Sequence, residues 1–138
     1  MPGGSPLEDF AEQMRLLRRE CAWKREQTHT SLIPFVREEA EEVVEAIESG
    51  DPAALCDELG DLLLQVVIHA VIAEEAGDFT LDDVARGVIA KMERRNPHVF
   101  GDAVATDAAE VLTLWNAAKA AEKAAAASPS TDHPGPTG

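Results

Sequence analysis

Apolar residues recur at helical intervals along most of the chain, and no segment alternates with the period of two that a half-buried strand requires. The first apolar stripe consists of Leu7, Phe10, Met14 and Leu17. This spacing predicts an amphipathic helix over residues 6–20, followed by a loop over residues 21–30. We therefore expect an all-α fold.

The same periodicity and a set of capping residues predict four further helices. We expect them over residues 31–49, 52–77 and 80–95, and from residue 107 into an alanine run at 124–127, where the last helix fades. Thr80 with Asp83, and Asp107 with Glu110, have the spacing of N-terminal caps. Pro97 is expected to end the fourth helix, because the residue before a proline avoids the helical conformation.

Glycine, proline and serine are concentrated at the two ends of the chain. This composition predicts a flexible N-terminus over residues 1–5 and a disordered C-terminal tail over residues 124–138. The length of 138 residues favours one domain, which we place at residues 6–123.

The charge is strongly acidic, with 12 Lys+Arg against 26 Asp+Glu and a formal net charge of -14. Such a chain repels nucleic acid, so we expect no nucleic-acid partner. A phosphorylated substrate would need a metal ion, a local basic patch, or both. Hydrophobic residues make up 45% of the chain, which is enough to form a core.

The sequence features that report on location favour the cytoplasm. Cys21 and Cys56 form no CxxC pair, and we interpret both as reduced thiols, with a single disulfide as the alternative. The N-terminus lacks the pattern of a signal peptide. The longest apolar run, residues 62–73, contains Gln65 and His69 and is too short to span a bilayer, so no membrane association is expected.

The second predicted helix carries an unusual concentration of acidic residues, namely Glu38, Glu39, Glu41, Glu42 and Glu45. Glu38 and Glu39 lie four and three positions before Glu42, so these three carboxylates crowd one region of the helix surface. Such a run by itself is ordinarily a solvated acidic face. Whether this acidic run is more than a solvated face depends on the residues that lie opposite it in the fold.

The third predicted helix places polar side chains in one narrow stripe on an otherwise apolar surface. The stripe consists of Glu58, Asp61, Gln65 and His69. A helix that is apolar on almost all sides is buried in a core or an interface, so its carboxylates face the interior or a cleft. Burying unpaired carboxylates costs several kcal/mol each. No Lys or Arg occurs between Arg37 and Arg86, and a divalent cation is the alternative partner.

The short connector between the second and third helices predicts an antiparallel hairpin. The hairpin brings Glu39 and Glu42 opposite Glu58 and Asp61, which is an all-oxygen site suited to Mg²⁺ or Mn²⁺. His69 suggests a di-iron carboxylate bundle as a rival. Those bundles use a Glu-x-x-His pair, which His69 does not form, so we interpret His69 as a polar residue with a partner in or near the core.

The pattern EExxE (Glu38, Glu39 and Glu42) followed by ExxD (Glu58 and Asp61) resembles the signature of the MazG nucleoside triphosphate pyrophosphohydrolases. The stretches CAWKREQTHTSL, DELGDLLLQVVIHA and KMERRNPHVFGD are also similar to family sequence, so the resemblance covers roughly residues 10–120. Members of the most similar type often carry two such domains. This chain has one, which looks more like the first copy.

The resemblance implies a MazG-like helical bundle of intertwined subunits that hydrolyses NTPs or dNTPs between the α- and β-phosphates, releasing NMP and pyrophosphate in the upkeep of the nucleotide pool. It also implies that Glu39, Glu42, Glu58 and Asp61 are the metal ligands and that Glu38 orients or deprotonates the attacking water. The apolar third helix independently predicts at least a homodimer, in which hairpins from two chains complete a four-helix core.

The resemblance further implies six substrate-binding residues: Lys91, Arg94, Arg95, Trp115, Lys119 and Trp23. The basic residues would contact phosphates, although cations also stabilise the last turn of any helix. Trp115 is alternatively a core or interface aromatic. The family commonly has Cys-Pro-Trp-Asp where this chain has Cys21-Ala22-Trp23-Lys24, so the role of this loop, including base contacts by Trp23, rests on a changed motif.

Two other function classes stay open at this point. One is a catalytically weak NTP-binding or regulatory module of the same fold, which would bind NTP without turnover. The other is a structural helical interaction domain, for which Mg²⁺ would leave the melting temperature unchanged.

Overall fold

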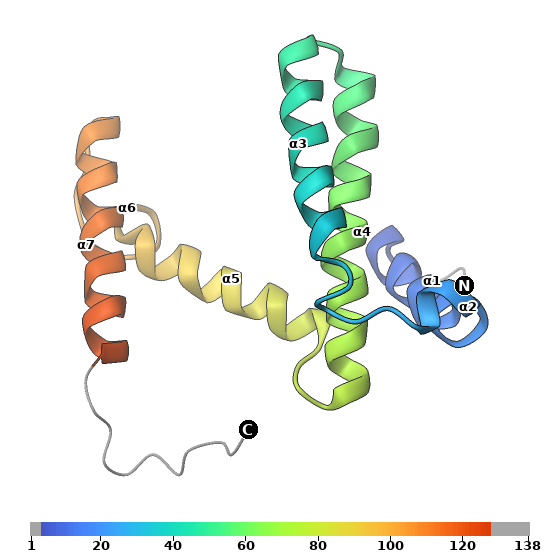
Figure 1. The fold of residues 1–138 in the computed structure, drawn as a ribbon. Coiled ribbons are helices and arrows are strands. Elements are labelled where there is room, and N and C mark those ends of the chain that lie inside the picture. The colour runs from blue at the N-terminus through green and yellow to red at the C-terminus, as the bar shows by residue number, and fades with distance from the viewer. Residues whose placement is uncertain (1–3, 128–138) are drawn as a thin grey trace. The chain divides into compact units, whose positions relative to one another are not determined.

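The computed structural model describes residues 4–127, and the elements of this part of the chain are helices joined by loops (Figure 1). The helices are α1 (Pro6–Glu20), α2 (Ala22–Arg25), α3 (Ile33–Ser49), α4 (Pro52–Ala76), α5 (Leu81–Arg95), α6 (Pro97–Phe100) and α7 (Ala108–Ala127). The all-α prediction is confirmed. The expectations for residues 1–3 and 128–138 lie outside the described residues.

Two short helices were not predicted from the sequence. The expected loop after α1 contains the single turn α2, at whose start the Cys21 sulfur accepts a hydrogen bond from the Lys24 backbone N–H at 3.5 Å. Pro97 ends α5, as predicted, but it also begins α6. Proline fits the first turn of a helix because its fixed φ is helical and its missing N–H would have no partner there.

Side-chain caps fix where α1, α5 and α7 begin. Ser5 forms a capping box with Glu8 at the start of α1, so this residue is held in place although the sequence assigned it to a flexible N-terminus. The predicted box at α5 is confirmed, because the Thr80 N–H donates to Asp83 Oδ2 at 3.0 Å and the Asp83 N–H to Thr80 Oγ1 at 3.2 Å. Asp107 likewise caps α7.

The helix α7 extends further than the sequence boundary at residue 123. It continues to Ala127, so the alanines at 124–127, which the sequence placed in a disordered tail, are helical. Alanine has the highest intrinsic helix propensity, which favours the continuation of the helix there.

The helices α3 and α4 lie side by side as an antiparallel hairpin, as predicted (Figure 1). Gly50 ends α3 at φ 74°, a left-handed conformation that other residues rarely adopt. One residue later, Asp51 Oδ1 accepts the Ala53 N–H at 3.0 Å and caps α4. This tight turn sets the register in which the two acidic segments meet.

The contacts of the chain divide into two compact units. The first unit ends at Val84 and the second begins at Ala85, so the boundary falls within α5. In the first unit, α1 packs against α4. The buried cluster combines residues of α1 and α4 with Leu32, which directly precedes α3, and its members are Ala11, Met14, Leu32, Val67, Ile68 and Val71. Leu7, predicted on the buried stripe of α1, is instead 51% exposed.

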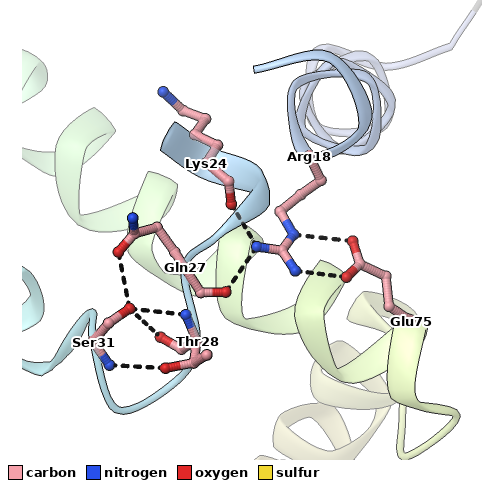
Figure 2. A network of polar contacts seen from close by, with 6 residues as sticks. All are labelled: Arg18, Lys24, Gln27, Thr28, Ser31 and Glu75. Carbon is pink, nitrogen blue, oxygen red and sulfur yellow. Dashed lines mark hydrogen bonds and ion pairs between the residues drawn. The ribbon is translucent and has the colours of Figure 1, made fainter. Parts of the chain in front are cut away.

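A network of polar contacts around Arg18 holds the loop between α2 and α3 (Figure 2). The Arg18 guanidinium forms a two-pronged ion pair with Glu75 and donates to the backbone carbonyls of Lys24 and Gln27. Beyond Gln27, the hydroxyls of Thr28 and Ser31 exchange hydrogen bonds with each other's backbone N–H groups. One arginine therefore links α1, the end of α4 and the loop that leads into α3.

None of the helices in residues 4–127 is long and apolar enough to cross a membrane.

Candidate active site

Four carboxylates gather on the facing sides of α3 and α4. Glu39 and Glu42 come from α3, and Glu58 and Asp61 come from α4. Each offers one carboxylate oxygen, and these four atoms lie within 4.8 Å of one another. The hairpin therefore brings together the four residues that the sequence singled out. We call this group the carboxylate cluster.

The electrostatic environment of the carboxylate cluster is unfavourable for a protein without a bound cation. Glu39 Oε2 and Glu58 Oε2 are buried and have no hydrogen-bond partner. Desolvation, reinforced by the neighbouring carboxylates of Glu42, Asp61 and Glu38, raises the pKa of Glu39 to about 7. Desolvation and the nearby Glu42 and Asp61 also raise the pKa of Glu58. The fold thus holds like charges together, and their repulsion destabilises the metal-free protein.

A divalent metal ion fits this donor set. Carboxylate oxygens are the ligands that hard cations such as Mg²⁺ and Mn²⁺ prefer. Within residues 4–127, none of the salt bridges reaches a member of the carboxylate cluster. The two buried oxygens without partners are therefore available to a cation.

Glu38 and Gln65 border the carboxylate cluster without belonging to it. Glu38 is exposed, and its charge contributes to the raised pKa of Glu39. Gln65 lies one helical turn beyond Asp61 on the same stripe of α4, is 6% exposed, and has a buried Oε1 atom without a partner. The sequence placed Gln65 on this stripe but did not select it as a site residue. Its burial shows that the polar lining continues past the cluster.

His69, the last residue of that stripe, pairs with a histidine from the loop before α3. The Nδ1 atoms of His29 and His69 lie 2.7 Å apart, and the two rings stack at 5.0 Å with an angle of 7°. Desolvation and the charge of His29 lower the pKa of His69. His69 therefore has a polar partner, as the sequence interpretation expected.

Trp23 lies next to the turn of α3 that precedes the carboxylate cluster. Its ring meets Phe35 edge-on, with centroids 5.7 Å apart and an interplanar angle of 86°. Phe35 is one helical turn before Glu39. Trp23 is 49% exposed, and the Lys24 ammonium lies 5.7 Å from the centre of its ring. An exposed aromatic surface is thus held close to the acidic site.

The remaining predicted site residues, Lys91, Arg94, Arg95, Trp115 and Lys119, belong to the second unit. There Arg95 lies over the Trp115 ring, 5.1 Å from its centroid, so α5 and α7 bring these two side chains together. Arg94 and Arg95 both form ion pairs with Glu122 on α7. Hydrogen bonds from Arg95 and then Arg94 lower the pKa of Glu122 to about 2.

Sequence reasoning did not identify Glu122. A signal was present, because Glu122 follows Trp115 by seven positions and Lys119 by three, which places the three residues on one face of a helix.

Comparison with known proteins identifies the family of this chain. A family model described as the MazG nucleotide pyrophosphohydrolase domain matches residues 27–100, the segment that contains the whole carboxylate cluster. The chain belongs to the MazG family. The resemblance inferred from the two acidic motifs is therefore confirmed.

MazG relatives share close sequence similarity with this chain. A nucleoside triphosphate pyrophosphohydrolase/pyrophosphatase MazG of Thermotoga maritima is 44% identical over 122 residues, which are 87% of this chain and 46% of the relative. A nucleoside triphosphate pyrophosphohydrolase of Escherichia coli K12 is 41% identical over 118 residues, 86% of this chain and 45% of the relative. The chain thus spans about half the length of these curated relatives.

A solved MazG structure has the same fold. The crystal structure of a mazG-related protein from Thermotoga maritima matches with a TM-score of 0.69 and 26% identity, covering 82% of this chain and 98% of that chain.

Proposed function

We propose that this MazG chain is a nucleoside triphosphate pyrophosphohydrolase that depends on Mg²⁺, or alternatively Mn²⁺, and cleaves (d)NTPs between the α- and β-phosphates to (d)NMP and pyrophosphate. The observation that carries the proposal is the carboxylate cluster, in which two buried oxygens have no partner. The printed names of the relatives from Thermotoga maritima and Escherichia coli support the same reaction class.

Glu39, Glu42, Glu58 and Asp61 would hold the divalent cation. When bound, the ion supplies positive charge beside the phosphate oxygens and helps to generate the nucleophile. The four carboxylates balance this charge and fix its position on two helices whose register is set by the turn at Gly50. The ion would also reduce the repulsion between a triphosphate and a chain with a net charge of -14.

Glu38 would orient the attacking water or accept a proton from it. Its carboxylate is exposed beside the carboxylate cluster, and it remains a better proton acceptor when it is not itself a metal ligand. The water oxygen forms a bond to the attacked phosphorus, and the P–O bond that joins the α-phosphate to pyrophosphate breaks. The electron pair of that bond leaves with pyrophosphate if the α-phosphorus is attacked and with (d)NMP if the β-phosphorus is attacked.

The other predicted residues divide into phosphate and base contacts. Lys91, Arg94, Arg95 and Lys119 supply cations that suit the β- and γ-phosphates, with Trp115 supporting Arg95. Trp23, next to the carboxylate cluster through Phe35, supplies an exposed ring on which a nucleobase can stack.

The test is incubation of the full chain with Mg²⁺ and a panel of NTPs and dNTPs, followed by identification of the products. NMP and pyrophosphate are expected, and Glu42→Gln should abolish them. Glu41→Gln is the matched control, because it removes the same charge from the same acidic run outside the carboxylate cluster. Hydrolysis in ¹⁸O-labelled water shows which phosphorus is attacked.

Other product patterns would redirect the proposal. If the products are orthophosphate and NDP, cleavage between the α- and β-phosphates is excluded. Calorimetry that shows NTP binding without any product would instead select the regulatory NTP-binding module.

We also propose that the active form is a homodimer or a higher homo-oligomer. The helix α4 exposes an apolar stripe that consists of Leu59 at 47%, Leu63 at 37% and Val66 at 43%. A second α3–α4 hairpin packed on this stripe would complete a four-helix core and remove the stripe from water.

A further inference from the structure

Glu122 fills the guanidinium edge that a phosphate group would use. Arg95 donates from Nε to Glu122 Oε2 at 3.2 Å and from Nη2 to Glu122 Oε1 at 2.9 Å, so one whole edge of this guanidinium faces the two carboxylate oxygens. Arg94 Nε donates to the same Oε2 at 3.2 Å. A carboxylate and a phosphate present the same two-oxygen edge to arginine. Glu122 therefore stands where an anion from the substrate would bind.

Partial burial stabilises the ion pair between Arg95 and Glu122. The Arg95 side chain is 16% exposed and is covered on one face by Trp115, and the Glu122 side chain is 24% exposed. Partial burial strengthens an ion pair relative to one in open water. The Arg94 side chain is 52% exposed, far more than that of Arg95. Arg94 is thus the more accessible of the two arginines to an incoming anion.

We propose that Glu122 is an internal counter-ion of Arg94 and Arg95, which a polyphosphate must displace in order to bind this basic cluster. The proposal rests on the proposed function, because it takes the two arginines to be phosphate contacts. The Glu122 carboxylate reduces the repulsion between the two guanidiniums. Two positive charges and one negative charge leave this group of three side chains with a net positive charge. The displacement lowers the affinity for the triphosphate and for released pyrophosphate alike, and it thereby favours product release.

The experiment compares the binding of inorganic tripolyphosphate, in the presence of Mg²⁺, to the full chain and to Glu122→Gln by calorimetry. The variant is expected to bind about fivefold more tightly, the equivalent of losing one partly exposed ion pair. Its melting temperature should fall, because the link between α5 and α7 is weakened. Tighter anion binding together with lower stability distinguishes a counter-ion from a residue that only supports the fold.

Glu93→Gln is the matched control. Glu93 is an exposed residue of α5 directly before Arg94, and its substitution changes the net charge by the same amount. A gain in Glu122→Gln that exceeds the gain in Glu93→Gln supports the proposal. Equal affinities in the two variants, or tripolyphosphate binding by Glu122→Gln no tighter than that of the wild type, would overturn it.

A shorter carboxylate keeps the proposal testable if Glu122→Gln loses its helicity. Glu122→Asp retains the charge but cannot reach both guanidiniums equally well, so tighter binding than the wild type supports the counter-ion role and equal or weaker binding overturns it. Hydrolysis of NTPs by the wild type is measured separately. A chain that hydrolyses no NTP but shows the Glu122→Gln gain would disprove the proposed function and retain the counter-ion.

Discussion

Glu39 on α3 and Glu58 on α4 each bury an Oε2 atom that has no hydrogen-bond partner, and the two carboxylates belong to a group of four whose nearest oxygens lie within 4.8 Å of one another. Two helices thus bring together negative charges that repel. Such an arrangement destabilises a metal-free protein and is relieved when a cation binds.

Mg²⁺ or Mn²⁺ should stabilise the wild-type chain against unfolding. At a metal concentration of about 100 times Kd, mass action predicts about 2.7 kcal/mol of added stability. In Glu39→Gln, the metal-free melting temperature should rise, because one repelling charge is removed, and the response to metal should shrink. Thermal denaturation with and without Mg²⁺ measures both effects. Glu41→Gln, outside the carboxylate cluster, should respond to metal like the wild type.

Metal binding should become stronger as the pH rises through about 7. The folded-state pKa of Glu39 is raised to about 7 from an ordinary value of 4.5. Between these values the metal-free folded state binds more protons than the unfolded state, so its stability falls as the pH increases. A cation must displace the proton, so calorimetry in buffers of different ionisation enthalpy should show proton release near pH 6. A Kd for Mg²⁺ that is constant from pH 6 to 8 would contradict this assignment.

Replacing Arg18 should destabilise the first unit. Its side chain is 9% exposed, pairs with Glu75, and donates to the carbonyls of Lys24 and Gln27. Arg18→Ala removes the side-chain donor to the Gln27 carbonyl and leaves the Lys24 carbonyl with only the Gln27 N–H, so it should reduce the free energy of unfolding by about 1–3 kcal/mol. Arg19→Ala is the control, because Arg19 is exposed and such changes stay within about 0.5 kcal/mol. Urea denaturation of both variants makes the comparison.

Trp23→Ala should weaken binding of the nucleoside but not of the polyphosphate. Loss of one base–aromatic stack predicts a rise in KM of about tenfold. The affinity for tripolyphosphate should stay at the wild-type value, because this ligand has no base. Phe79→Ala removes another half-exposed aromatic of the first unit and should leave KM unchanged. Equal losses for NTP and tripolyphosphate would show that Trp23 acts only through the fold.

Charges on the apolar stripe of α4 should prevent self-association. Light scattering of the wild type should give at least twice the mass of one chain, whereas the double variant Leu59→Glu/Leu63→Glu should give the monomer mass. Val104→Glu introduces a charge at an 81% exposed position and should keep the wild-type mass. A wild-type chain that remains a monomer with intact helicity would exclude the proposed four-helix core.

Local sequence signals were sufficient for most of the helices and for the carboxylate cluster. Caps such as Thr80 with Asp83 act over three residues, so the start of the helix can be predicted without the tertiary structure. The short turn at Gly50 also fixed the pairing of α3 with α4, because only an antiparallel hairpin fits so short a connector. Together with the polar stripe of Glu58 and Asp61 on α4, that pairing predicted that the four carboxylates face each other.

Contacts between residues far apart in the chain could not be predicted from the sequence. His29 and His69 are 40 positions apart, and nothing in the spacing of either indicates that their Nδ1 atoms lie 2.7 Å apart. The ion pairs of Arg94 and Arg95 with Glu122 depend likewise on how α5 and α7 pack. The division into two units also depends on packing, because it reflects where contacts are dense and not where composition changes.

The sequence by itself determined the helical class, the facing carboxylates and the membership in the MazG family, because periodicity, caps and motif spacing are properties of short stretches of chain. Only the tertiary structure decided which of those charges have partners. Glu39 and Glu58 keep buried oxygens without hydrogen-bond partners. Arg94 and Arg95, which were predicted to contact phosphates, are instead paired with Glu122. Burial and pairing depend on atoms that are far apart in sequence, so they are determined only when the chain folds.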